Sequence, residues 1–572
     1  MSTAKVFRDA LLAYLGREKE LAEAESDRRR DLSRAEKIDE GLLLPDLPVV
    51  SSAGGPSNHE YCFRLGGDRM RLRIGEVVSV IPSGTSPAGP VRGTVLEVSF
   101  DTIVLGTGKK DLDTARIYDL ETVDSPLYDG FLSALSDIGE YDPGAFFLGL
   151  LGGVNTPSDE PVFGPSPEAL DLAGGYATEL DATQMDALLR TVRQPSVHLV
   201  QGPPGTGKTR VLSSLAASLS LAGMETAVVA KTHQAVNNAL NAVARRSPDL
   251  TAVKIGQATR SEGLLPEVLT FDTFGSYLAW RNSGKKRVRR NDVVGMTLNA
   301  AAVNMCLRNT GFKPQTVLVD EASQIPLAEA AMLGGSGAGS VIFFGDDRQM
   351  PPIFYSEMED DPLSVSVFSR IGNLYPDRCS VLGVSYRMND EICSLVSRRF
   401  YEPFGIRIAP SAYSAPRRMA LQGNADDGRI AGIFRETAPS VVTLNVSLQQ
   451  VWRDSNPEEA GFAAELAGFA MKAGVDPADI AVVTPFRSQV ALIRAALGKA
   501  GLKGSDCPLV DTVERLQGQD VRLIILSFSV TDPDYYRSVQ QFLQNPNRLN
   551  VMVSRAKEKV VILGGDCLRL VW

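Results

Sequence analysis

Cysteine and histidine are scarce in this sequence. Its 572 residues include six cysteines and three histidines, and no two cysteines form a C-x-x-C pair. Scattered thiols of this kind favour a reducing cytoplasm and exclude a zinc site of the usual spacing. Long apolar runs are also missing, because the longest, residues 145–154, contains glycines and is too short to cross a bilayer. Charges at Lys5, Arg8 and Asp9 do not fit a signal peptide. We therefore expect a cytoplasmic protein with no membrane partner.

The chain also lacks an excess of positive charge. Its formal net charge is -9, which argues against a wholly basic surface that coats nucleic acid. A local basic channel stays compatible with this charge. Hydrophobic residues make up 44% and charged residues 22%, which is ordinary for soluble globular proteins, and the length predicts several domains.

Residues 202–209 form the clearest motif. They fit the pattern G-x-x-x-x-G-K-[ST], follow a short apolar run at 197–200 and precede an apparent helix at 210–222. Glycines let backbone N–H groups turn toward phosphate oxygens, and the helix N-terminus adds partial positive charge. We expect the whole stretch to bind a nucleoside triphosphate, with Lys208 on the β- and γ-phosphates and Thr209 on Mg²⁺. The stretch is Gly202, Pro203, Pro204, Gly205, Thr206, Gly207, Lys208 and Thr209. The complete pattern disfavours the alternative, a Gly/Pro turn without a ligand.

Polar residues that suit phosphoryl transfer follow later in the chain. An apolar strand at 317–319 ends in Asp320 and Glu321, where the first carboxylate suits a water-mediated Mg²⁺ contact and the second suits activation of the attacking water. A solvated carboxylate pair is the alternative. Gln349 is the candidate amide beside the γ-phosphate, and Arg387 and Arg555 are candidates to stabilise its charge from across a cleft. For either arginine alone, a surface ion pair is the simpler interpretation.

The order of sequence patterns predicts several units. Residues 1–40 read as a helical stalk, with Phe7, Leu11 and Leu15 on one stripe that packs on the same protein; a coiled-coil dimer is disfavoured because sustained heptads are missing. Residues 43–56 read as a linker, 57–125 as a small β-barrel and 126–179 as a connector with one short helix. Residues 180–372 and 373–572 each alternate strands and helices, which predicts two α/β domains.

Taken together, these blocks resemble a superfamily 1 helicase of the 5′→3′ translocating branch, superfamily 1B. Relatives in this group are the nonsense-decay, immunoglobulin mu-binding and DNA2-type helicases, and the chain looks like an AAA-domain, bacterial-type member. The matching blocks occur in the family's order at residues 180–184, 202–209, 230–237, 294–297, 320–323, 345–352, 386–388, 484–486, 510–520 and 548–557. The resemblance implies two RecA-like domains, with the stalk and barrel as an inserted accessory domain and a second insertion at about 266–291.

The resemblance also implies roles for single residues. Gln184 would read adenine, Tyr386 would stack on the base, and Arg387 and Arg555 would be arginine fingers. Asp520 stands on the nucleotide side where the family usually has Glu, so its role in coupling is open. The residues expected to contact the nucleic acid are Thr232, His233, Thr297, Pro485 and Thr512, with Lys285 and Lys286 in the insertion. Trp280, also in the insertion, is a candidate to stack on a base.

We therefore predict an enzyme that uses ATP and Mg²⁺ to move 5′→3′ along single-stranded DNA or RNA. One alternative is a clamp on nucleic acid or on a protein partner that ATP switches with little unwinding. A second is an unrelated P-loop enzyme such as a kinase, which the paired arginines disfavour. Contacts to phosphates and bases serve both polymers, so the choice between DNA and RNA stays open.

Overall fold

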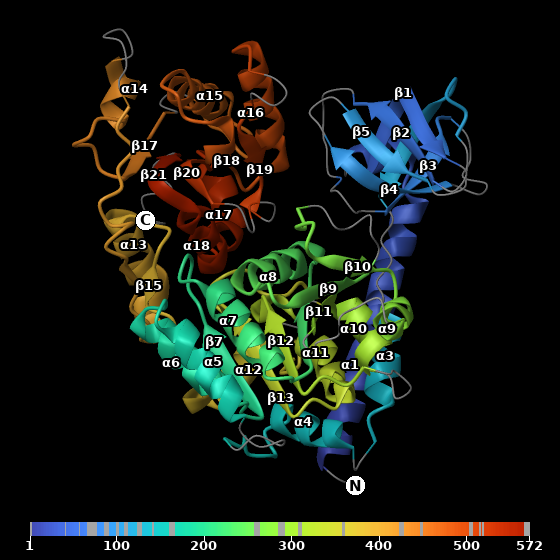
Figure 1. Ribbon diagram of the computed structural model, residues 1–572. Coiled ribbons are helices and arrows are strands. Elements are labelled where there is room, and N and C mark those ends of the chain that lie inside the picture. The colour runs from blue at the N-terminus through green and yellow to red at the C-terminus, as the bar shows by residue number, and fades with distance from the viewer. Residues whose placement is uncertain are drawn as a thin grey trace.

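Two parallel sheets and a small antiparallel barrel organise the chain (Figure 1). The structure is a computed structural model. It describes residues 3–39, 42–55, 58–65, 72, 77–84, 91–98, 102–107, 112–122, 128–139, 142–159, 166–256, 263–283, 292–306, 312–356, 361–421, 428–446, 450–502, 507–513, 516 and 520–564. We call the part built on the first sheet lobe 1 and the part built on the second sheet lobe 2.

Lobe 1 holds an eight-stranded parallel sheet in the order β10-β9-β11-β8-β12-β13-β7-β14. Its strands are β7 (Val197–Gln201), β8 (Thr226–Ala230), β9 (Thr251–Ile255), β10 (Leu269–Phe271), β11 (Asp292–Thr297), β12 (Thr316–Asp320), β13 (Ser340–Gly345) and β14 (Cys379–Val381). Helices that pack beside the sheet include α6 (Ala182–Thr191), α7 (Lys208–Leu221), α8 (His233–Arg246) and α12 (Val367–Leu374). All carboxyl ends of the strands therefore lie along one edge.

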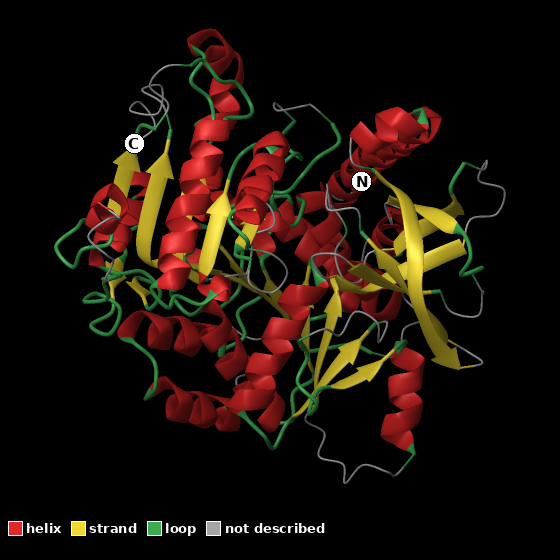
Figure 2. Ribbon diagram, turned by 90° about the horizontal axis from the view of Figure 1, so that it is seen from above, coloured by secondary structure: helices red, strands yellow, loops and turns green. Residues whose placement is uncertain are grey.

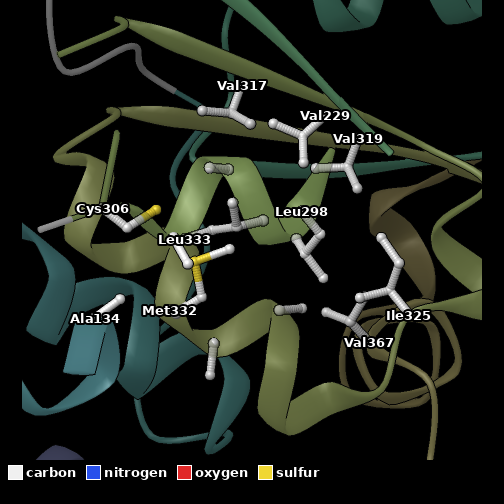
Figure 3. Packing of buried hydrophobic residues seen from close by; sticks show 14 of the residues in the cluster. Ala134, Val229, Leu298, Cys306, Val317, Val319, Ile325, Met332, Leu333 and Val367 are labelled. Carbon is white, nitrogen blue, oxygen red and sulfur yellow. The ribbon is translucent and has the colours of Figure 1, made fainter. Parts of the chain in front are cut away.

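Alternate residues of these strands serve two separate cores. Val317 and Val319 of β12 face one apolar cluster, which also contains Leu298, Met332 and Leu333 (Figure 3), whereas Leu318 faces the other. Because both faces are covered, the strands are apolar almost throughout, as is usual for parallel sheets. The sequence pattern that predicted an α/β domain is confirmed.

Lobe 2 holds a five-stranded parallel sheet in the order β17-β21-β20-β18-β19. Its strands are β17 (Val441–Leu444), β18 (Ile480–Val483), β19 (Leu509–Asp511), β20 (Val521–Ser527) and β21 (Ala556–Leu563). Its helices include α13 (Asp390–Val396), α15 (Pro457–Lys472), α16 (Arg487–Lys499), α17 (Pro533–Leu543) and α18 (Pro546–Ser554), and helices cover both faces of the sheet (Figure 2). The expected domain border at 372/373 is displaced, because β14 still pairs with β7 of lobe 1.

The N-terminal region is a stalk that carries the barrel. Helix α1 (Thr3–Asp31) places Leu11 and Leu15 in the core of lobe 1, a short break follows, and α2 (Arg34–Asp39) leads into the barrel (Figure 1). The closed barrel has the strand order β1-β2-β5-β4-β3-β6. Its strands are β1 (Leu43–Gly55), β2 (Asn58–Arg64), β3 (Val77–Pro82), β4 (Val91–Val98), β5 (Thr102–Gly106) and β6 (Ile117–Thr122).

Two expectations for this region are wrong. The predicted linker at 43–56 is strand β1, and its proline-rich start is accommodated by an irregularity between Leu44 and Leu47, where Asp46 has φ 55°. The connector holds three helices rather than one, α3 (Tyr128–Ser136), α4 (Pro143–Leu151) and α5 (Pro167–Ala177). Pro143 and Pro167 begin helices instead of breaking them. No helix in the described ranges has the length and apolar character of a membrane span.

Candidate active site

The phosphate loop lies between β7 and α7, at the carboxyl edge of the lobe 1 sheet. Gly205 and Gly207 have φ values of 73° and 82°, a left-handed backbone that glycine adopts without steric cost. A Cβ on Gly205 would lie 2.4 Å from the Cβ of Arg387, and one on Gly207 would lie 2.5 Å from Nε2 of Gln184. The loop is thus packed closely by lobe 2 on one side and by α6 on the other. The Lys208 ammonium donates to the carbonyl oxygen of Gly202.

The two carboxylates at the end of β12, Asp320 in the strand and Glu321 directly after it, have different surroundings. Asp320 is buried, and burial together with Glu321 raises its pKa, while Lys208 opposes the shift. A buried carboxylate of this kind is stabilised by a bound cation, so Asp320 and Thr209 fit the Mg²⁺ that the motif predicts. Glu321 has φ 51°, a strained conformation for a residue other than glycine. Its carboxylate accepts a 3.2 Å hydrogen bond from Gln324.

The segment after β13 is tied to lobe 2 through Asp346. The Oδ1 atom of this buried residue accepts a 2.7 Å hydrogen bond from Gln201. The Oδ2 atom accepts from Gln349 Nε2 at 2.5 Å and from the Tyr401 hydroxyl of lobe 2 at 2.6 Å. Asn550 of α18 donates to the same hydroxyl at 2.8 Å. Burial raises the pKa of Asp346, and the hydrogen bonds that it accepts oppose the shift.

Two arginines of lobe 2 converge on this segment and on the phosphate loop. Arg555 donates to Gln349 Oε1 at 3.3 Å, and Arg387 donates to the carbonyl oxygen of Ser554 at 3.0 Å. Asp520 lies between them, 2.7 Å from Nη2 of Arg387 and 3.8 Å from Nη1 of Arg555. Within the described residues, neither buried Nε atom has a hydrogen-bond partner. Burial and the neighbouring Arg387 lower the pKa of Arg555 to about 10. The pair therefore offers unsatisfied donors and positive charge to an anion.

Gln184 and Tyr386 lie at the other side of the phosphate loop. The amide of Gln184 is fully buried, donates to the Thr206 carbonyl at 2.8 Å and accepts from the Asp181 backbone, so here it holds the loop. The Tyr386 hydroxyl donates to the carboxylate of Asp181, the N-cap of α6, at 3.0 Å. Contact of either side chain with adenine stays a prediction.

Comparison with known proteins assigns a family to this arrangement. Two protein-family models, each described as an AAA domain, match residues 179–361 and 363–566. The DNA replication ATP-dependent helicase/nuclease DNA2 of Mus musculus is 29% identical over 419 residues, which cover 69% of this chain and 38% of the relative. These matches support a DNA2-like helicase of superfamily 1B.

Other relatives of this DNA2-like chain agree with the assignment. The helicase/nuclease JHS1 of Arabidopsis thaliana is 28% identical over 398 residues, 68% of this chain and 28% of the relative. The DNA polymerase alpha-associated DNA helicase A of Schizosaccharomyces pombe is 27% identical over 442 residues, 68% of this chain and 64% of the relative. The chain thus spans less than two thirds of each of these relatives. The crystal structure of an arterivirus nonstructural protein 10 helicase aligns over 90% of this chain and 77% of its own length, with 15% identity and a TM-score of only 0.37.

The residues expected to contact nucleic acid lie at the carboxyl edges of the two sheets. Thr232 follows β8 and Thr297 ends the adjacent strand β11, and each is the N-cap of the helix that comes next. His233 begins α8, and Pro485 and Thr512 follow the adjacent strands β18 and β19 of lobe 2. The structure therefore places these residues of the DNA2-like chain at the carboxyl edges of the two sheets. Their contact with nucleic acid stays a prediction.

The second insertion is described in part. Trp280 lies at the end of α9 (Phe274–Asn282) and packs against Phe271 and Tyr277, with ring centroids 5.3 and 6.3 Å apart. It is half-buried against the core of lobe 1, and its stacking on a base stays a prediction. Lys285 and Lys286 lie outside the described residues.

Sequence reasoning missed Asp346, Tyr401 and Asn550. Asp346 could have been found, because it is the first residue after the strand that leads to Gln349. Tyr401 carries no such signal, because it lies outside every matching block. Asn550 lies inside the block at 548–557, but its partner Tyr401 is distant in the sequence.

Proposed function

We propose that this DNA2-like chain is an ATP-dependent 5′→3′ translocase or helicase that acts on single-stranded nucleic acid. The observation that carries the proposal is the convergence of Arg387 and Arg555 from lobe 2 on the phosphate loop and Gln349 of lobe 1. Lobe closure would complete the site, so a nucleotide between the lobes can bias their relative position. Translocation needs two lobes that bind the same nucleic-acid strand and move relative to each other.

In the proposed reaction, Glu321 accepts the proton of the attacking water, and Gln349 orients that water. Lys208 and the loop N–H groups bind the β- and γ-phosphates, and the two guanidinium groups stabilise the charge that develops on the γ-phosphate. Thr209 and Asp320 would hold Mg²⁺, which neutralises phosphate charge when bound. Asp520 keeps the two guanidinium groups together and sets their orientation.

The alternative is a clamp that ATP switches with little unwinding. The complete set of catalytic residues disfavours an inactive switch but fits a slow one. We also propose a cytoplasmic location, because the described cysteines Cys62, Cys306, Cys379, Cys393 and Cys507 are all free thiols.

The experiment that tests the function is ATP hydrolysis with no polymer, with single-stranded DNA and with single-stranded RNA. The Glu321→Gln variant should lose hydrolysis and keep ATP binding, while Glu465→Gln, an exposed change on α15, should behave as wild type. Stimulation of hydrolysis by one polymer would identify the nucleic acid on which the protein moves. Strand displacement on substrates with 5′ or 3′ tails would give the direction of movement. No stimulation by either polymer would favour the clamp, and hydrolysis retained by Glu321→Gln would refute its assigned role.

A further inference from the structure

We propose that the stalk helix α1 couples the segment after Gln349 to the barrel, and that Glu18 is the positioning residue of this connection. The inference rests on the proposed function, because it concerns how nucleic acid near the barrel changes the ATP site. It adds a role to a helix that packs in the core of lobe 1 and carries the barrel.

Glu18 makes the central contact. Its carboxylate is buried at 3% exposure although it lies on a helix dense in charged residues. Oε2 accepts from the backbone N–H of Tyr355 at 2.8 Å, and Oε1 accepts from that of Ser356 at 2.9 Å. Two charge-assisted bonds to adjacent N–H groups fix the position of this backbone more firmly than an apolar contact does. The held residues follow Gln349 closely in the chain.

The same helix also contacts residues 361 and 364, which come later in the chain. The hydroxyl of Tyr14, which is 2% exposed, is 2.9 Å from Oγ of Ser364, and Arg17 pairs with Asp361 at 3.3 Å. A cavity of about 220 Å³ is lined by Gln349, Pro352, Phe354 and Ser364, and by Ser323, two residues after Glu321. Gln349 therefore shares a cavity with Ser364, which α1 contacts, and with Phe354, the neighbour of Tyr355.

The other end of the stalk is fixed to the barrel. Arg34 of α2 forms a bidentate pair with Asp119 of β6, with distances of 2.7 and 3.0 Å. Asp119 is buried and also accepts from Ser83 at 2.7 Å, and Lys37 pairs with Glu121 at 2.8 Å. Ser33 and Glu36 cap α2 reciprocally across the short break after α1, with bonds of 2.8 and 3.3 Å. The barrel cannot tilt on α2 without breaking charged hydrogen bonds.

The barrel lies near Thr232 and Thr297, the residues of lobe 1 that are expected to contact nucleic acid. In the lobe 1 sheet, β11, which ends at Thr297, and β8, which precedes Thr232, lie in the half toward β10. The phosphate loop follows β7 in the other half. The barrel lies beyond the β9–β10 end of this sheet (Figure 1). A nucleic-acid strand bound at Thr232 and Thr297 would thus lie next to the barrel. If this strand displaces the barrel, the barrel pulls on α1 and on the segment after Gln349. A rigid helix of 29 residues, about 44 Å long, can carry this displacement.

The test is the ratio of ATP hydrolysis with single-stranded nucleic acid to hydrolysis without it, in the full chain. Glu18→Ala and Arg34→Ala, which cut the connection at opposite ends, are each expected to lower this ratio at least about fivefold, the lower range of ordinary allosteric coupling. The matched controls are Glu20→Ala and Arg30→Ala, exposed changes near each site that should keep the wild-type ratio. Where Glu18→Ala does not fold, Tyr14→Phe removes only the hydroxyl that contacts Ser364 and is expected to lower the ratio as well.

A wild-type ratio in folded Glu18→Ala and Arg34→Ala would overturn the inference, while stimulation of the wild-type chain would leave the proposed function standing. A loss confined to Glu18→Ala would also overturn it, because the effect would then be local to the active site. No stimulation of the wild type by DNA or RNA would overturn the proposed function and this inference with it.

Discussion

The hydroxyl of Tyr401 is expected to speed hydrolysis without strengthening ATP binding. This fully buried residue of lobe 2 donates to Asp346 of lobe 1 at 2.6 Å and accepts from Asn550. A hydrogen bond to a charged group contributes about 1.5–3 kcal/mol, and each 1.4 kcal/mol changes a rate about tenfold. If the bond forms only when the lobes close, Tyr401→Phe lowers kcat by about 10- to 100-fold. The phosphate loop belongs to lobe 1, so the dissociation constant for ATP should change little.

The assay is steady-state hydrolysis at saturating nucleic acid, with ATP affinity measured separately on the non-hydrolysing Glu321→Gln background. Tyr375→Phe is the matched control, because that hydroxyl donates to the carbonyl oxygens of Leu150 and Asn155, away from lobe 2. It should lower the melting temperature without changing kcat. Should Tyr401→Phe lower the melting temperature and leave kcat unchanged, the hydroxyl would be structural, and the coupling argument would be refuted.

Two further predictions concern stability and the phosphate loop. Burial lowers the pKa of His198 to about 4 from an ordinary 6.5, so between these values the unfolded chain binds a proton that the folded chain does not, and stability falls as the pH falls through this window. The loss reaches about 2 kcal/mol between pH 6.5 and pH 5, and thermal unfolding of His198→Gln should show a smaller loss; an equal loss would contradict the assignment. Gly207→Ala should weaken ATP binding at least about tenfold, because its Cβ meets Gln184 at 2.5 Å and its φ is 82°. Gly223→Ala, with the same φ and no atom within 4 Å, should lose stability and keep its affinity in a nucleotide-binding titration.

Much of the fold could be predicted because parallel strands buried on both faces leave continuous apolar runs. Val317 to Val319 and Leu523 to Leu526 are such runs, and each forms a central strand. The connector at 126–179 could not be predicted in the same way. Helix α4 is apolar on nearly all sides, so no helical period appears, and Pro143 reads as a break when taken alone. Strand β1 was hidden because its first residues follow an irregular path past two prolines.

Some residues of the candidate site could be predicted from local sequence, and others could not. Lys208, Asp320 and Glu321 could be found because each lies where a buried strand or turn of lobe 1 ends, and local spacing places them. Asp346 and Tyr401 meet only after the lobes pack together, and no spacing in the chain reports that contact. Glu18 is hidden for a further reason, since nothing in a charged helix distinguishes the one carboxylate that is buried from its exposed neighbours.

The charges between the lobes suggest why closure should depend on the nucleotide. Arg387 and Arg555 approach the same carboxylate of Asp520, and burial together with Arg387 lowers the pKa of Arg555 although Asp520 and Glu321 oppose the shift. The two carboxylates therefore do not fully offset the cost of burying neighbouring guanidinium groups, and closure without an anion is disfavoured. A γ-phosphate would supply the missing negative charge and favour closure, and its departure would restore the repulsion. In the proposed cycle, opening after hydrolysis is therefore driven by the same two arginines that stabilise the reaction.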